Sequence, residues 1–127
     1  MTGWTPAELH RIGSAEELQI ITGRRDGSDR PPVPIWVVRV GDELYVRSFR
    51  GPDGAWYRHA SQHPAGRIRA GGIDRAVTFD AAGRDGEVRP AVDDAYRAKY
   101  ARYGDSYLGP MLAEQAAATT LKLTPSS

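Results

Sequence analysis

Apolar residues gather in two runs of β-type composition in the first half of the chain, Val33 to Val40 and Glu43 to Phe49. The polar pair Gly41-Asp42 lies between them, and a tight polar turn between two such runs is a strong signal for a β-hairpin. A glycine pair separates two further runs, Arg67 to Ala70 and Asp74 to Phe79. The pattern therefore predicts two hairpins in the middle of the chain.

The start of the chain carries a helix signal. Thr5-Pro6-Ala7-Glu8 places a hydroxyl at the cap, proline at the first helical position and glutamate three residues after the cap. We expect a helix that runs from this cap to about Arg11 and ends at Gly13. Further helices are predicted at three places: residues 54–63, the segment that follows Pro90, and residues 106–118.

Two single strands complete the set of elements, because residues 18–22 and 119–123 are rich in β-branched and aliphatic side chains. About five or six short strands with helices between them indicate an α+β fold, a small antiparallel barrel with peripheral helices. A chain of 127 residues is large enough for one core, so residues 1–127 are expected to form a single domain.

Composition narrows the function classes. The formal net charge is only +1, but residues 24–75 hold ten arginines against six carboxylates, so the chain is locally basic. The absence of cysteine excludes disulfides and thiolate chemistry and fits a reducing compartment. Because the sequence shows no leader-like start and no run of about 20 apolar residues, we expect a soluble, cytoplasmic protein without membrane contact.

The basic residues lie at loops and strand ends beside glycines and aromatic residues. Guanidinium groups at such places can bind phosphate bidentately, which makes an anionic cofactor the leading hypothesis. Two groups of candidates stand out: Arg24, Arg25 and Arg30 in the loop 23–30, and Arg47, Ser48 and Arg50 at the end of the second apolar run. The alternatives are a solvated loop neutralised by its own aspartates and a cross-strand ion pair. Trp56 is a candidate for stacking on a flat ring, whereas Trp36 is expected in the core.

The order of these features resembles a known family. Gly23-Arg24-Arg25-x-Gly27-x-x-Arg30, a hairpin from Trp36 to Phe49, and Trp56 follow one another at matching spacing. This arrangement resembles the deazaflavin-dependent nitroreductase branch of the flavin-binding split-barrel superfamily. The rest of the chain is similar to a small, mostly bacterial family of unknown function in the same superfamily.

The resemblance implies a split β-barrel homodimer that binds flavin mononucleotide or a deazaflavin coenzyme near the subunit boundary. The protein would then be an oxidoreductase acting on a small organic substrate, with the hydride chemistry supplied by the cofactor. The residues implied in cofactor binding are Arg24, Arg25, Arg30, Arg47, Ser48, Arg50 and Trp56, with His59 beside the ring.

Two residues depart from the family pattern. Asp26 replaces the hydroxyl residue of the loop, and a carboxylate beside a phosphate opposes binding unless an arginine neutralises it. His59 replaces the asparagine that follows the tryptophan. Both side chains can transfer protons, so Asp26 and His59 are the candidate catalytic residues.

These departures keep two other functions open. One is a cofactor-free isomerase or cyclase of secondary metabolism that uses the same barrel pocket, and the other is a non-enzymatic small-ligand-binding module. A metal site is not expected, because His59 and His63 lie four residues apart without an obvious third ligand. Nucleic-acid binding is not expected either, because the total charge is near neutral and no binding fingerprint is present.

Overall fold

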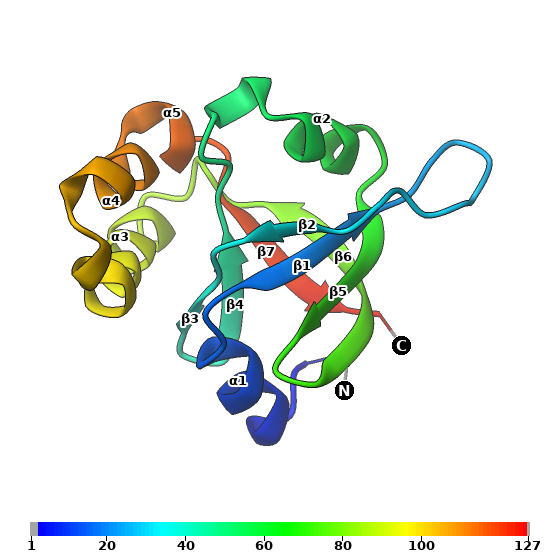
Figure 1. Ribbon diagram of the computed structural model, residues 1–127, viewed down its shortest axis with the longest axis horizontal. Coiled ribbons are helices and arrows are strands. Elements are labelled where there is room, and N and C mark those ends of the chain that lie inside the picture. Colours follow the sequence, from blue (N-terminus) through cyan, green and yellow to red (C-terminus); the bar gives the residue numbers. More distant parts are fainter. Residues whose placement is uncertain (1–2, 127) are drawn as a thin grey trace.

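The computed structural model describes residues 3–126, whose strands form one antiparallel sheet in the order β2-β1-β5-β6-β7-β4-β3 (Figure 1). The strands within this range are β1 (Leu18–Thr22), β2 (Val33–Ile35), β3 (Val38–Val40), β4 (Glu43–Val46), β5 (Ala65–Ala70), β6 (Ile73–Ala81) and β7 (Leu121–Pro125). Both predicted hairpins are present, as β3–β4 and β5–β6. The expected α+β class and antiparallel barrel architecture are confirmed.

Helices surround the sheet on several sides. They are α1 (Pro6–Gly13), α2 (Ala55–Gln62), α3 (Val88–Tyr100), α4 (Asp105–Leu112) and α5 (Glu114–Ala117), with short 3₁₀ turns η1 (Gly51–Asp53) and η2 (Ala101–Tyr103). The capping box predicted at the start of the chain is formed, since Thr5 and Glu8 exchange side-chain to backbone hydrogen bonds. Figure 1 shows α3, α4 and α5 grouped beside β3 and β4, with α2 at the opposite end from α1.

The sheet is curled, and the connection between β2 and β3 shows why. These strands occupy the two ends of the strand order, yet only Trp36 and Val37 separate them in sequence. Three peptide steps reach about 11 Å at most, whereas a flat sheet would place its outer strands almost 30 Å apart, at about 4.8 Å per strand. The sheet must therefore bend into a half-barrel that brings its two edges together.

This curl corrects the expectation that residues 33–40 form one strand. The chain pairs with β1 on one edge, leaves the ladder at Trp36-Val37, and then pairs with β4 on the other edge. Helix α3 supplies the hydrogen bonds that the ladder loses there: the Val37 amide donates to the Tyr100 hydroxyl, 3.2 Å, and the Val37 carbonyl accepts from Lys99 Nζ, 2.7 Å. The expected helix 106–118 is also divided, because Ala113 is extended between α4 and α5.

Two groups of buried apolar residues hold the layers together. One fills the inside of the half-barrel and includes Leu18, Ile20, Leu44, Ile68 and Leu123. The other joins α3 and α4 to the outside of β3 and β4, and it includes Tyr96 and Tyr100 of α3. Because helices cover the outer face as well, β4 is buried on both sides, and this positions the residues that follow it.

Candidate functional site

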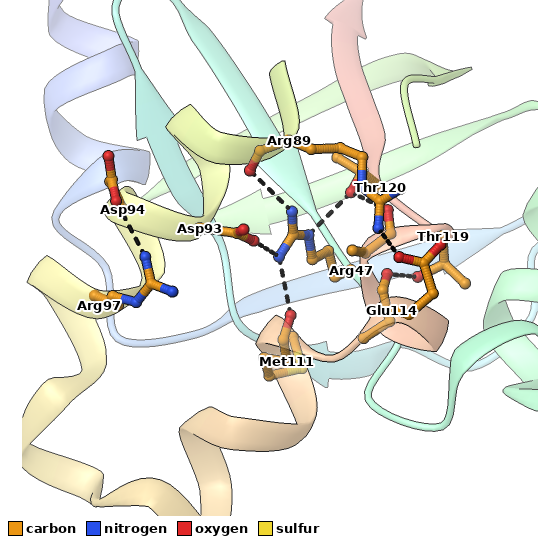
Figure 2. Close-up of polar contacts among 11 residues, drawn as sticks. Arg47, Arg89, Asp93, Asp94, Arg97, Met111, Glu114, Thr119 and Thr120 are labelled. Carbon is orange, nitrogen blue, oxygen red and sulfur yellow. Dashed lines mark hydrogen bonds and ion pairs between the residues drawn. The ribbon is translucent and has the colours of Figure 1, made fainter. Parts of the chain in front are cut away.

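Directly after β4, Arg47 is fully shielded from solvent and bonded on all sides (Figure 2). Its guanidinium donates to Asp93 Oδ1, 2.6 Å, the Met111 carbonyl, 2.9 Å, and Thr120 Oγ1, 2.9 Å, with a longer bond to the Arg89 carbonyl, 3.3 Å. Asp93 lies on α3 and Met111 on α4, so this one side chain joins two helices to the sheet. The role predicted for Arg47 in cofactor binding stays a prediction. Most of its N–H groups already donate hydrogen bonds within the protein.

A first hollow of about 470 Å³ lies between β2, the end of β4 and the start of α2. We call it the apolar pocket. Its apolar wall consists of Val33, Ile35, Trp36, Phe49, Trp56, Tyr107 and Met111. Its polar side chains are Glu17, Arg47, Ser48 and Arg50. The candidate ring-stacking residue Trp56 thus lies in the same hollow as the three candidates of the strand end.

Ser48 is a buried polar residue of this pocket, and its two polar groups differ in their contacts. Its amide donates to Thr119 Oγ1, 2.9 Å, which fixes the backbone in place. Its hydroxyl is buried and has no hydrogen-bond partner among residues 3–126. A buried hydroxyl without a partner costs free energy, and a polar atom of a ligand in the pocket would remove that cost.

A second hollow of about 350 Å³ lies between the β1–β2 loop and the C-terminal half of α2. We call it the basic pocket. Its wall consists of Gly23, Arg25, Arg30, His59, Gln62 and His63. Nε of Arg30 is buried there and has no hydrogen-bond partner within the part of the chain that the structure describes. Two of the predicted phosphate ligands, Arg25 and Arg30, are therefore brought together with His59.

The remaining loop candidates lie outside both hollows. Arg24 turns into its own loop, donating to the Asp29 carbonyl at 2.8 Å and to Ser28 Oγ at 3.4 Å. Asp26 accepts from the amide and the hydroxyl of Ser28, at 2.9 and 2.6 Å, and these two hydrogen bonds lower the pKa of its carboxyl. Figure 1 shows this loop projecting away from the body of the molecule. The catalytic role predicted for Asp26 stays untested, and neither pocket includes it.

The two pockets share two structural elements. Trp56 of the apolar pocket and His59 of the basic pocket lie one turn apart on α2, a rise of about 4.5 Å. Arg30 and Val33, which line the basic and the apolar pocket, also lie three residues apart, on the non-helical segment that leads into β2. The structure thus places the apolar pocket and the basic pocket next to each other along α2.

His59 differs electrostatically from an isolated histidine. Burial of its ring, followed by the nearby charges of Arg30 and Arg58, holds the pKa of His59 below its usual range. These surroundings therefore favour the neutral form of the imidazole. The position predicted for His59 beside the ring of a cofactor stays a prediction, and the structure places His59 at the same pocket as Arg25 and Arg30.

Sequence reasoning missed several lining residues. Phe49 and Tyr107 are exposed aromatic side chains at the apolar pocket, and no local pattern marks them as site residues. Trp36, expected in the core, stacks on Tyr100 with ring centroids 4.0 Å apart and lines the same pocket. His63 was considered only as a metal ligand, although its spacing from His59 already predicted that the two share a helix face.

The curled antiparallel half-barrel sheet with peripheral helices is a fold that this chain shares with several solved structures. A NimC/NimA family protein from Clostridium acetobutylicum matches with a TM-score of 0.63 and 15% identity, over 93% of this chain and 78% of its own. An FAD-binding protein from Mesorhizobium loti matches with a TM-score of 0.61 and 12% identity, over 98% of this chain and 91% of its own. An F420 reductase matches with a TM-score of 0.51 and 17% identity, over 94% and 93%.

At these identities the similar structures establish the fold alone. The family follows from the sequence itself: residues 8–123 match the family described as an uncharacterized protein conserved in bacteria (DUF2255), and the chain belongs to it. The predicted similarity to a bacterial family of unknown function is confirmed, and the split-barrel fold that the other part of the resemblance implied is confirmed as a fold. No curated protein matches the chain.

Over residues 3–126, the structure contains no helix that is long and apolar enough to cross a membrane.

Proposed function

We propose that this protein binds a flavin or deazaflavin cofactor and acts as an oxidoreductase on a small organic substrate. The observation that carries the proposal is the pair of adjoining pockets, one apolar and bordered by Trp36 and Trp56, the other basic and lined by Arg25 and Arg30. Such a cofactor joins a flat ring system to an anionic tail through a short chain. The similar structures that are described as an FAD-binding protein and an F420 reductase support this choice of cofactor class.

The residues present fit such a group. Ser48 at the apolar pocket and Arg30 at the basic pocket each carry a buried polar atom without a partner among residues 3–126, Oγ and Nε, and a ligand that reached these atoms would supply one. Trp56 would contact the ring, while Arg25 and Arg30 would neutralise the tail through charge-assisted hydrogen bonds. When bound, the cofactor supplies hydride transfer. The protein's own part is to orient the ring, exclude water and balance charge.

The test is an absorbance spectrum of the purified protein, followed by fluorescence titrations with flavin mononucleotide and with the deazaflavin coenzyme. Arg30→Gln should weaken binding by about 10- to 100-fold, because one charge-assisted bond contributes about 1.5–3 kcal/mol. Arg24→Gln is the matched control, since Arg24 lies in the same loop but bonds within it. A colourless protein that binds neither cofactor, or equal losses in both variants, would refute the proposal.

The expected homodimer also remains a proposal, and three exposed apolar side chains support it. Val33, Phe49 and Tyr107 are 37%, 51% and 60% exposed, and all three lie at the apolar pocket. We propose that a second copy of the chain covers this face and closes the pocket. Sedimentation at micromolar concentration should show a dimer that Phe49→Ser with Tyr107→Ser converts to monomer. A wild-type monomer under these conditions would contradict the idea.

The runner-up is a cofactor-free isomerase or a simple binding module. In the isomerase, His59 would act as the base. That reading loses support from the position of Asp26, whose carboxylate is fully exposed and bonded to Ser28. Binding of a planar ligand without any flavin binding would favour it.

A further inference from the structure

The wall of the basic pocket is built almost entirely from groups that donate hydrogen bonds or carry positive charge. Arg25 and Arg30 come from the β1–β2 loop, and His59, Gln62 and His63 come from the end of α2. No carboxylate lines the pocket among the residues that the structure describes. Because the donors converge from two separate elements, a ligand inside would be held from both sides.

His63 is held at this wall by close packing. A β-carbon at position 23 would lie 3.2 Å from Cδ2 and 3.4 Å from Nε2 of His63, so the imidazole lies against the Gly23 backbone. The ring is thus fixed where a strand end meets the end of α2. This arrangement places two imidazoles and two guanidiniums around one small hollow.

The charged groups beside His59 are arginines, and His63 lies with them at the pocket wall. Arg30 and Arg25 face it from the loop, Arg58 is its neighbour on α2, and His63 lies one turn further along. The same loop carries two carboxylates, Asp26, which is engaged by Ser28, and Asp29, whose backbone pairs with Gly23, and neither residue lines the pocket. The residues that line the pocket therefore leave its positive charge without a counter-charge, which an anion would supply.

We propose that the basic pocket is a receptor for a dianionic terminal phosphate, and that its occupation places a proton on His59. The inference rests on the proposed function for the molecule that carries the phosphate, and it names a phosphomonoester such as flavin mononucleotide over a phosphodiester. A terminal phosphate offers three oxygens to donors arriving from two sides, and it has no second ester chain that must leave the pocket. A diester offers two free oxygens and one negative charge.

The proton follows from electrostatics. Burial and two guanidiniums keep the pKa of His59 low while the pocket is empty. An opposite charge within about 4–6 Å raises the pKa of an imidazole by about 1–3 units, and a dianion acts about twice as strongly as a monoanion. Anion binding and proton uptake by His59 are linked. As pH increases from below the pKa of free His59 to above its pKa in the complex, the affinity for the anion should fall by about tenfold for each unit by which binding raises that pKa.

Proton NMR tests this directly, because the chain has only three histidines, His10, His59 and His63. The imidazole signals are assigned with His59→Gln and His63→Gln and titrated with pH in chloride, sulfate and methyl sulfate at equal ionic strength. Sulfate remains a dianion and methyl sulfate a monoanion over this range, so neither probe titrates. His10 lies on α1, away from the pocket, and its signal controls for general salt effects.

The expected result is that saturating sulfate raises the titration midpoint of His59 by at least about one unit, and that methyl sulfate raises it less than half as much. Arg30→Gln should abolish the rise, and Arg24→Gln should preserve it. An unmoved His59 midpoint, equal effects of the two anions, or a parallel change at His10 would overturn the proposal.

The outcome is separable from the proposed function, which is read from flavin titrations of the same protein. A sulfate-linked shift without flavin binding would keep the phosphate receptor and remove the cofactor. Flavin binding without a shift would keep the cofactor and remove the dianion receptor. Preference for flavin mononucleotide over flavin adenine dinucleotide is expected if both proposals hold, and it should be strongest just below neutral pH, because a phosphomonoester loses its second charge below about pH 6.

Discussion

Replacement of Arg47 by methionine removes the guanidinium but keeps an unbranched apolar side chain in the same space. The structure allows the effect to be worked out group by group. The arginine side chain is 0% exposed, while its ion-pair partner Asp93 is 27% exposed at 2.6 Å. Without the guanidinium, the carbonyl of Met111 and the hydroxyl of Thr120 also lose a donor within 2.9 Å.

Removal of one partner from a buried ion pair typically destabilises a protein by about 3–5 kcal/mol. Asp93 retains some contact with water, which reduces the cost of leaving it alone. We therefore expect Arg47→Met to lower the free energy of unfolding by about 3 kcal/mol, a large share of the 5–15 kcal/mol typical of a domain. Asp93→Asn keeps an acceptor for Arg47 but leaves its fully buried charge without a counter-charge, so it should cost a similar amount, about 2–3 kcal/mol.

Urea-induced unfolding followed by far-ultraviolet circular dichroism measures both changes. Arg50→Met is the control, because Arg50 is exposed and should change stability by no more than about 0.5 kcal/mol. If Arg47→Met fails to fold, Asp93→Asn, which keeps a hydrogen-bond acceptor for Arg47, still tests the reasoning. A loss below about 1 kcal/mol for Arg47→Met would show that the network contributes little.

Two further predictions concern Gly66 of strand β5 and Lys99 of helix α3. Gly66→Ala should destabilise by more than about 2 kcal/mol in thermal unfolding, because a β-carbon there would overlap the Ile21 carbonyl oxygen, whereas Gly109→Ala has free space and should be neutral or stabilising. Burial lowers the pKa of Lys99 from 10.5 to about 8, so between these values the unfolded chain binds more protons and stability should rise with pH. Lys99→Met should remove that rise between pH 8 and 10, above which the tyrosines Tyr96 and Tyr100, whose pKa values are raised by burial, act in the opposite direction. A flat stability profile for the wild type over this window would contradict the role of Lys99.

The parts of the fold that were predictable from sequence rest on local contacts. The capping box at Thr5 and Glu8 and the tight hairpin turns involve residues only a few positions apart, so their signals are complete in a short window. The division of residues 33–40 depends on distant partners, β1 on one side and β4 on the other. Pro34 was the available signal, because a proline within a run is typical of an edge strand.

The candidate site shows the same limit. Clustered arginines predicted an anion site, and the structure brings Arg25 and Arg30 together at one pocket. The sequence could not separate Arg24, which bonds inside its own loop, or Arg47, whose partner Asp93 lies 46 positions further along. Arginines in equivalent sequence settings thus receive different roles from contacts that form only in the folded chain.

Arg47 and Ser48 are adjacent, and this links the stability of the sheet to the shape of the apolar pocket. Arg47 is fixed to α3 and α4, and the Ser48 amide is fixed to Thr119, so the wall at Ser48 is positioned from behind by contacts that touch no ligand. If Arg47 acts through this positioning, Asp93→Asn should weaken binding of a planar ligand together with Arg47→Met. If Arg47 instead contacts the ligand, only Arg47→Met should weaken it. Titration of both variants with the ligand, without urea and at a temperature where each is folded, distinguishes the two roles. Unchanged ligand affinity of Asp93→Asn would refute the positioning role.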